Sequence, residues 1–364
     1  MIDRERLTST FCELVRIDSP SGEEEAMARE LEDRLGFLGF TIERDSYGNL
    51  IASEHQPPSL ILSAHMDTVE PGRGIQPIVD GDQVRTDGTT ILGGDCKAGI
   101  AAILESLYAI KEEGITRIPI QLVFTKGEEI GLVGAKNLDF SLLKTKEALV
   151  FDGNGPVTKV TTATPTYIGL DVHVTGRAAH AGVEPEKGLS AIKIAAEIIT
   201  QLPQGRIDDE TTLNVGTTTG GTVRNAVPEE AAFTGEFRSR NAETLDLIRM
   251  QVLGTLEETR KRYPDAIIQE EMTVDFERYS LSEDDPLVAR ATRLLLSMDL
   301  RPELGPSGGG TDANIFNQHG IRCVVVGMST RDMHTTREYV EIPDLVDTAR
   351  FCHALLTDPE AMVR

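Results

Sequence analysis

Four short and almost purely apolar segments constrain the fold of this chain most strongly. They cover residues 60–64, 118–125, 148–151 and 321–327. Near-continuous apolar runs of this length are typical of strands that are buried on both faces of a parallel sheet. Apolar residues also recur with helical spacing over 97–113, where Gly114 is a plausible helix stop. Strands that alternate with helices predict an α/β domain with a central, mostly parallel sheet.

The middle of the chain has a different pattern, with an alternating strand at its start. The order there is strand, helix, strand, strand, helix, strand, over residues 166–175, 190–202, 211–218, 230–238, 242–263 and 267–279. This order predicts a small α+β unit of the ferredoxin-like type. At 364 residues the chain is long enough for two domains. We therefore expect residues 165–277 to form a unit inserted into a first domain of residues 1–164 and 278–364.

Metal-binding residue types follow all four apolar segments. In chain order they are His65 and Asp67, Glu128 and Glu129, Asp152, and His334 in a later loop, while Asp95 directly precedes the helix at 97–113. Ligands of open α/β sheets bind beyond the carboxyl ends of the strands, so we expect these side chains to share one crevice. Two histidines and several carboxylates suit one or two borderline ions such as zinc.

Each of these residues has an ordinary explanation when it is taken singly. Asp95 suits a helix N-cap, His65 suits a strand end, and Glu128 and Glu129 suit a solvated loop. These explanations leave unaccounted why all of them fall at one end of the same predicted sheet. Asp152 is the most informative residue, because a carboxylate that ends a buried apolar strand needs a partner.

The charge of the chain excludes some partners. Its formal net charge is −23, and such a surface repels phosphate backbones and acidic membranes, so neither nucleic acid nor membrane is an expected partner. No apolar run approaches the roughly 18 residues that span a bilayer, and the first residues lack the pattern of a secretory signal. The four cysteines stand singly, which indicates free thiols and a cytoplasmic location.

Seven segments of the sequence match a known family in order along the chain. They are SAHMDTV (63–69), GGDCKAG (93–99), FTKGEEIGLVGAK (124–136), LVFDG (149–153), AAHAGVEPEKG (178–188), RNAVPEEAAFTGEFRSR (224–240) and GPSGGGTDANIF (305–316). The chain resembles the dinuclear zinc metallopeptidases that include peptidase T, carboxypeptidase G-type enzymes, bacterial dipeptidases and aminoacylases. Within that family it is similar to the peptidase T-like, or tripeptidase, branch.

The resemblance implies a ligand set for two Zn²⁺ ions, with Co²⁺ or Mn²⁺ as alternatives. Asp95 would bridge the ions, His65 and Asp152 would complete one site, and Glu129 and His334 would complete the other.

The resemblance also implies the roles of neighbouring residues. Asp67 would orient His65, and Glu128 would be the general base that takes a proton from the water bridging the ions. The peptide bond between Asp95 and Cys96 would be cis. Many relatives carry Asp or Asn in place of Cys96, whose side chain would be a buried filler rather than a ligand.

The inserted unit would be a lid that also forms a homodimer. By resemblance, His180 would stabilise the oxyanion, while Asn225 and Arg238 would hold the substrate backbone and its carboxylate. Gly309 and Gly310 would let the substrate backbone approach closely. Without the surrounding motifs, a surface histidine, a solvated arginine and a tight turn would explain the same residues.

The predicted activity is hydrolysis of short peptides, most simply by an aminopeptidase or tripeptidase that acts on free N-termini. Relatives with Asp rather than Glu at the position of Asp152 tend to be aminopeptidases and dipeptidases, and this favours the first reading. The alternatives are a two-zinc carboxypeptidase or N-acyl-amino-acid amidohydrolase, and a catalytically silent metal-binding protein that serves as an interaction partner.

Overall fold

A computed structural model describes residues 1–362, in which the chain divides into two compact units. The first unit contains Met1–Ala163, Ser280–Ser307 and the chain from Thr311 onward, and the second contains Thr164–Tyr279 and Gly308–Gly310. The sequence predicts junctions after residues 164 and 277. It assigns the glycines 308–310 to the first domain, whereas in the structure they cluster with the second unit.

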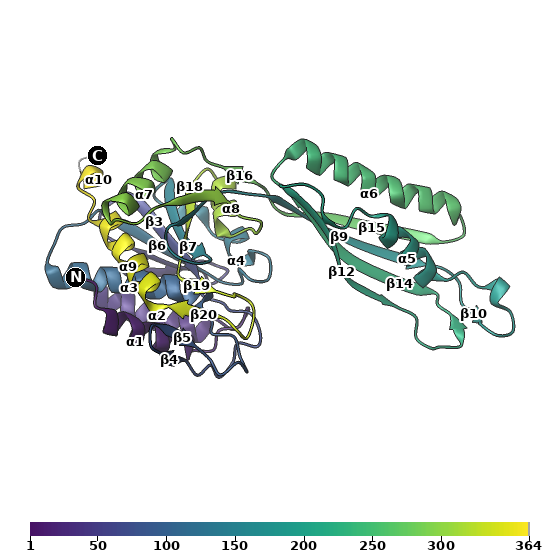
Figure 1. The fold of residues 1–364 in the computed structure, drawn as a ribbon, viewed down its shortest axis with the longest axis horizontal. Helices are drawn as coiled ribbons and strands as arrows, with labels where there is room; N and C mark the ends of the chain where they lie inside the picture. Colours follow the sequence, from purple (N-terminus) through teal and green to yellow (C-terminus); the bar gives the residue numbers. More distant parts are fainter. Residues whose placement is uncertain (363–364) are drawn as a thin grey trace. The chain divides into compact units, whose positions relative to one another are not determined.

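The first unit is built on a nine-stranded mixed sheet with the order β1-β2-β6-β3-β7-β18-β8-β16, and β17 pairs with β8 (Figure 1). The four apolar segments are its central strands, and neighbouring pairs among them are parallel, as predicted. The outer strands β2 and β8 run antiparallel to β6 and β18 and were not predicted. The strands are β1 (Thr41–Arg44), β2 (Leu50–Ser53), β3 (Leu60–His65), β6 (Ile120–Thr125), β7 (Glu147–Gly153), β8 (Lys159–Thr164), β16 (Tyr279–Ser280), β17 (Glu303–Pro306) and β18 (Arg322–Gly327).

Both faces of the central strands are buried, which explains why their sequences are almost continuously apolar. Alternate residues such as Leu62 and Leu149 join the main hydrophobic core, while Ile61 and Val150 are buried outside it. Helix α3 packs on β3 and β7, α9 packs along α3, and α8 contacts β7 and β18. The helices are α1 (Arg4–Val15), α2 (Glu25–Leu38), α3 (Gly94–Glu113), α4 (Val133–Lys136), α7 (Pro286–Ser297), α8 (Asp312–Gln318), α9 (Ile342–Leu356), α10 (Pro359–Met362) and the 3₁₀ turn η1 (Phe140–Leu142).

A small antiparallel sheet, β19-β20-β5-β4, completes the first unit. Its strands are β4 (Ile78–Asp80), β5 (Gln83–Arg85), β19 (Thr330–Arg331) and β20 (Tyr339–Glu341). It frames the loop of residues 332–338, which carries His334.

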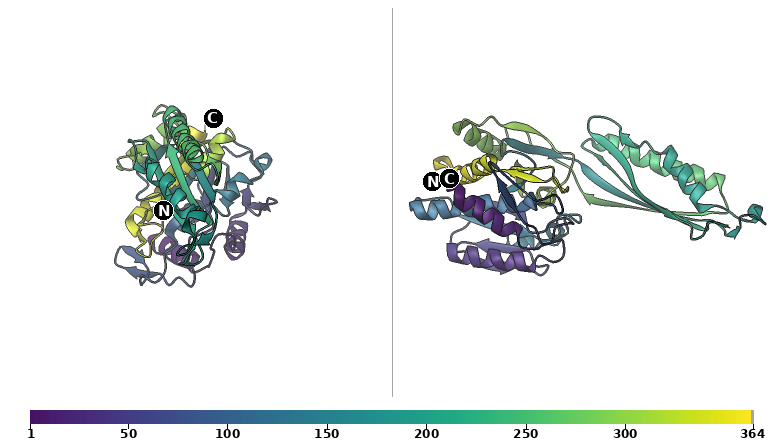
Figure 2. Two further views of the ribbon diagram at one scale, coloured as in Figure 1. Left: turned by 90° about the vertical axis from the view of Figure 1, so that its right-hand side faces the viewer. Right: turned by 60° about the horizontal axis from the view of Figure 1, so that its bottom comes forward.

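The second unit is an antiparallel sheet with the order β11-β12-β14-β9-β15 and two helices along one face (Figures 1 and 2). On β9 every second residue from Ile168 to Val174 is buried beneath the helices. This is the predicted ferredoxin-like α+β arrangement. Its elements are β9 (Thr166–Thr175), β10 (Ala179–His180), η2 (Pro185–Lys187), α5 (Ala191–Gln201), β11 (Gly205–Arg206), β12 (Thr211–Gly220), β13 (Ala226–Val227), β14 (Glu230–Ser239), α6 (Ala242–Arg262) and β15 (Ile267–Phe276).

Within residues 1–362, none of the helices combines the length and the apolar character needed to cross a bilayer.

Candidate active site

The side chains predicted to bind metal meet at the carboxyl ends of the parallel strands. His65 is the last residue of β3, Asp152 lies near the end of β7, and Asp95 lies in the first turn of α3. Glu129 lies in the turn after β6, and His334 lies in the loop between β19 and β20. The parallel sheet therefore gathers residues that are up to 269 positions apart in the sequence, counting from His65 to His334.

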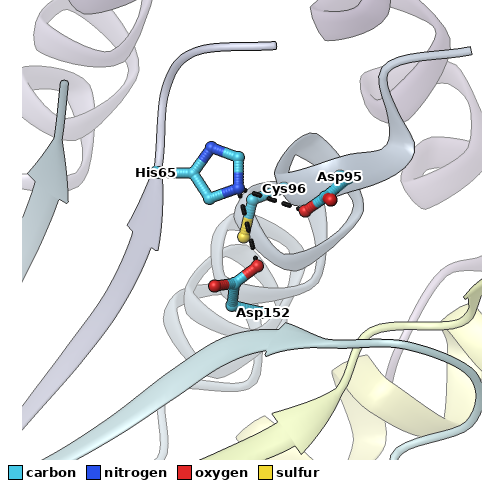
Figure 3. A group of neighbouring side chains, drawn as sticks. All are labelled: His65, Asp95, Cys96 and Asp152. Carbon is cyan, nitrogen blue, oxygen red and sulfur yellow. Dashed lines mark hydrogen bonds and ion pairs between the residues drawn. The ribbon is translucent and has the colours of Figure 1, made fainter. Parts of the chain in front are cut away.

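The first cluster lies around the buried ring of His65. Its Nε2 atom lies 3.1 Å from Asp95 Oδ1 and 3.5 Å from Asp152 Oδ1 (Figure 3). Cys96 lies beside them, but its thiol donates a hydrogen bond to the main-chain oxygen of Phe151. Burial raises the pKa of the Cys96 thiol well above its usual value. Cys96 is therefore a buried donor to the backbone rather than a ready thiolate ligand.

The second cluster lies around His334. Its Nε2 atom lies 3.1 Å from Asp95 Oδ2 and 3.0 Å from Glu129 Oε2. The two oxygens of Asp95 therefore face different histidines, Oδ1 toward His65 and Oδ2 toward His334. In each cluster the candidate ligand atoms lie within 4.8 Å of one another. A carboxylate shared in this way suits a ligand that bridges two ions.

The electrostatics of the site also fit a pair of cations. Burial raises the pKa of Asp152 to about 8, and burial followed by the charge of Asp95 raises that of Glu129. Among the described residues, Glu129 Oε1 is buried and has no hydrogen-bond partner. Carboxylates that are crowded and buried in this way hold protons unless positive charge is supplied. The donor set of imidazole and carboxylate groups suits zinc and similar divalent ions.

Glu128 sits beside these clusters, in the same turn as Glu129. Burial, followed by the charge of Asp152, raises the pKa of Glu128 well above its usual value. A carboxyl group whose pKa is shifted toward neutrality can both accept and return a proton, as general acid–base catalysis requires.

Asp67 supports both halves of the site. The ring nitrogen Nδ1 of His65 lies 2.9 Å from the main-chain oxygen of Asp67, and 3.4 Å from its carboxylate. That carboxylate accepts hydrogen bonds from the main-chain N–H groups of Glu128 and Glu129, at 3.0 and 3.2 Å, and from the Ser21 hydroxyl at 2.7 Å. Asp67 thus holds the Glu128–Glu129 turn as well as the ring of His65.

In the second unit, the structure brings His180 and Asn225 together. Strands β10 and β13 pair so that His180 lies opposite Ala226, and Ala181 N donates to Asn225 O at 3.0 Å. Both side chains belong to exposed residues. These two short strands were not predicted from the sequence; β10 lies at one end of the second unit (Figure 1), and β13 pairs with it.

Arg238 lies at the opposite end of β14 and is held on several sides. Its Nε donates to Glu236 at 2.9 Å, its Nη1 to Gly308 O at 3.3 Å, and its guanidinium lies 4.5 Å from the centre of the Tyr167 ring. A Cβ atom at Gly310 would come within 2.3 Å of the Phe276 ring. In this structure the close neighbour that requires a glycine at position 310 is therefore Phe276.

Comparisons with known proteins agree with this architecture. Residues 162–264 match the profile of a peptidase dimerisation domain, and residues 48–161 match that of peptidase family M28. The chain is 37% identical to the uncharacterized protein YqjE of Bacillus subtilis, over 98% of this chain and 99% of the relative.

Two solved structures are similar over nearly the whole chain. One is the aminopeptidase PepT of Bacillus cereus, at 35% identity over 100% of both chains with a TM-score of 0.88. The other is a tripeptidase of Staphylococcus aureus, at 33% identity over 98% of both chains with a TM-score of 0.92. The chain belongs to the M20 peptidases, in the branch of peptidase T.

The cis peptide bond that the resemblance implied is present in this M20 peptidase, between Asp95 and Cys96. The sequence did not single out three other buried charged residues near these two clusters of candidate ligands. Glu24 accepts from Gly127 N at 3.0 Å, Glu338 accepts from the segment before Asp95, and Lys97 donates to Ile17 O at 2.8 Å. Sequence periodicity does not reveal such residues, because the backbone groups to which they hydrogen-bond lie far away in the sequence.

Asp312 is a further buried carboxylate of the peptidase that the sequence did not single out. It accepts a short hydrogen bond from Thr125, the last residue of β6. Burial raises the pKa of Asp312 to about 6. Asp312 therefore fixes the strand end from which the Glu128–Glu129 turn departs.

Proposed function

We propose that this M20 peptidase is a two-metal aminopeptidase that releases N-terminal residues from tripeptides and other short peptides. The observation that carries the proposal is the position of the Asp95 carboxylate between two histidines. Its Oδ1 atom lies 3.1 Å from His65 Nε2, and its Oδ2 atom lies 3.1 Å from His334 Nε2. The solved relatives, an aminopeptidase and a tripeptidase, support the substrate class. Zinc is the proposed metal, with Co²⁺ or Mn²⁺ as alternatives, because the donors are imidazole and carboxylate groups.

The proposed chemistry assigns one task to each part of the site. Bound divalent ions would polarise the scissile carbonyl and lower the pKa of the attacking water. Glu128 takes the proton of that water and later returns it to the departing amine, a role that its burial favours. Asp67 holds Glu128 in place through two main-chain N–H groups of the turn.

In the second unit, His180 is the proposed donor to the oxyanion, Asn225 and Arg238 are the proposed holders of the substrate, and Gly309 and Gly310 are proposed to let its backbone approach. Arg238 suits a carboxylate because its guanidinium is already ordered by Glu236 and Tyr167.

The spacing inside the second unit supports a homodimer as the active form. Glu230 and Arg238 are eight strand steps apart on β14, which is about 26 Å. His180 and Asn225 lie beyond Glu230, whereas an extended tripeptide spans only about 10 Å. One protomer therefore cannot apply both His180 and Arg238 to the same tripeptide, and we propose that a partner subunit supplies His180.

The second unit also offers a surface for such a pairing. It matches a peptidase dimerisation domain. Beyond the two-residue strand β11, its edge strand β12 continues through residues 216–220, which carry no charge. Edges that proteins protect from pairing usually carry charges, so this edge suits pairing with a second copy.

Mixing two inactive variants tests the shared site. Removing an oxyanion donor typically costs about 10²–10³-fold in kcat, so His180→Ala alone should be nearly inactive, as should Glu128→Gln. After subunit exchange, a heterodimer contains one site with an intact Glu128 and a His180 from the other chain. Random pairing should restore about a quarter of wild-type activity, since half of the dimers would each have one complete site.

Two results would contradict the shared site. An exchanged mixture that stays inactive would mean that each protomer uses its own His180. Full activity of His180→Ala alone would remove His180 from the site altogether. Size-exclusion chromatography of the wild type and of both variants is the control for assembly.

A panel of matched substrates tests the reaction itself. We expect a free tripeptide to be hydrolysed from its N-terminus, and its N-acetylated form to react at least about 10²-fold more slowly, since the alternative enzymes are the ones that accept blocked N-termini. C-terminal amidation should raise KM for the wild type but change little for Arg238→Ala, which has no charge to offer the carboxylate. Preference for the acetylated substrate would favour the hypothesis of an amidohydrolase or carboxypeptidase. If no substrate were hydrolysed, the hypothesis of a catalytically silent metal-binding protein would be favoured.

We also propose a cytoplasmic location. All four cysteines are free and buried in the structure, which suits a reducing compartment. Cell fractionation with an antibody against the chain would test this placement.

A further inference from the structure

We infer that Glu338 is a positioning residue that fixes the bridging carboxylate of Asp95 relative to His334, and that it thereby sets the metal affinity of the Asp95–Glu129–His334 cluster. The inference rests on the proposed function, because it assigns a task to Glu338 in a two-metal site.

The contacts of Glu338 are concentrated on the segment that carries Asp95. One carboxylate oxygen accepts from Leu92 N and Gly93 N, both at 2.8 Å, and the other accepts from Asp95 N at 3.1 Å. Glu338 is only 2% exposed, and the three N–H groups belong to buried residues. A single carboxylate therefore satisfies three buried backbone donors within four residues of chain.

Glu338 also belongs to the loop that carries the other half of the cluster. His334 lies four residues before it, and Glu338 N donates to Thr335 O at 3.0 Å. Asp332 and His334 have positive φ angles of 50° and 62°, which are unfavourable for residues with a Cβ atom. A loop with two such residues needs stabilising contacts elsewhere. The hydrogen bonds that the Glu338 carboxylate accepts connect this loop to the Asp95 segment.

Loss of the Glu338 carboxylate should leave a buried backbone N–H group of the Asp95 segment without an acceptor. A glutamine at position 338 keeps the size of the side chain but presents one oxygen and one NH2 group. Whichever way it turns, the NH2 group faces a backbone donor, either Asp95 N or the pair Leu92 N and Gly93 N. Buried donors without an acceptor are unfavourable, so we expect the loop that carries Glu338 and His334 to shift away from the Asp95 segment, which moves His334 relative to Asp95 and Glu129.

The test is the binding of Zn²⁺ alone to the full chain, measured by titration of the metal-free protein. Replacing residues that support metal ligands usually costs 10–100-fold in affinity, so Glu338→Gln should weaken one of the two sites by about that factor and leave the other close to wild type. Glu341→Gln is the matched control, because Glu341 is a partly exposed neighbour that accepts from the Gln83 side chain. We expect the control to bind both ions as the wild type does.

The outcomes separate this inference from the proposed function. If the wild type binds no zinc, the proposed function fails. If the wild type binds two ions and Glu338→Gln binds both with unchanged affinity, only the role of Glu338 is refuted. Equal weakening of both sites, with a lower melting temperature of the metal-free protein, would also refute it, because that is the pattern of general destabilisation.

A second variant covers the case in which Glu338→Gln does not fold. Glu338→Asp keeps the charge, but its shorter side chain cannot reach all three donors. It should also weaken one site selectively, and unchanged binding of both ions by this variant would refute the inference.

Discussion

Glu128→Gln should lower kcat for tripeptide hydrolysis by at least about 10²-fold, the lower end of the scale for losing a general base, while the protein keeps its full metal content. The amide cannot accept the proton of the attacking water, but it has nearly the same size as the carboxyl group that it replaces. Asp67 binds the turn through the main-chain N–H groups of Glu128 and Glu129, so the turn should keep its position. Steady-state kinetics together with metal analysis of the same sample would measure both parts of the prediction.

The adjacent glutamate provides the matched control. Glu129 Oε2 lies 3.0 Å from His334 Nε2, so Glu129→Gln should weaken one metal site instead of sparing both. The assignment of the pair would be wrong if Glu128→Gln lost metal and Glu129→Gln kept it. It would also be wrong if both variants kept the turnover of the wild type.

Removing the metal should abolish peptidase activity, and Asp95→Asn should come closest to that effect among single substitutions. Asp95 is the only proposed ligand shared by both clusters, and an amide nitrogen cannot replace the second carboxylate oxygen. Chelation should also lower the melting temperature. An ion present at 100 times its Kd stabilises the folded state by about 2.7 kcal/mol per site.

Protons should compete with the metal in this experiment. Hydrogen bonds to Asp95, and then to Glu129, raise the pKa of His334 to about 10 in the metal-free site, and burial raises that of Asp152 to about 8. Both groups therefore carry protons at pH 7, and bound metal must displace them. Metal affinity should fall as the pH is lowered from 8 to 6. Calorimetry in two buffers of different ionisation enthalpy should detect proton release, and binding that is independent of both pH and buffer would contradict the assignment of these ligands.

The central part of the fold was predictable because its signal is local. The four apolar runs are buried on both faces, so their sequences alone mark them as strands, and parallel packing then places His65, Glu129 and Asp152 at one edge. The outer strands β1, β2 and β8 were not predicted, because β1 and β8 are partly polar and β2 has only four residues. Their strand conformation depends on the edges that they cover.

The supporting residues of the site could not be predicted for a different reason. Glu338 meets the Asp95 segment across 243 positions of sequence, and Glu24 meets Gly127 across 103. Each looks like an ordinary acidic loop residue until the fold brings its partners to it. Gly310, in the loop before α8, is a similar case, because its close neighbour Phe276 lies in β15, 34 positions earlier in the sequence.

The most direct test of the account is a zinc titration of the metal-free protein with tripeptide hydrolysis followed in the same samples. We expect no activity without metal, and full activity on the free tripeptide only as the second equivalent of zinc is bound, because Asp95 serves both ions. Full hydrolysis of the tripeptide by the chelated, metal-free protein would contradict the account.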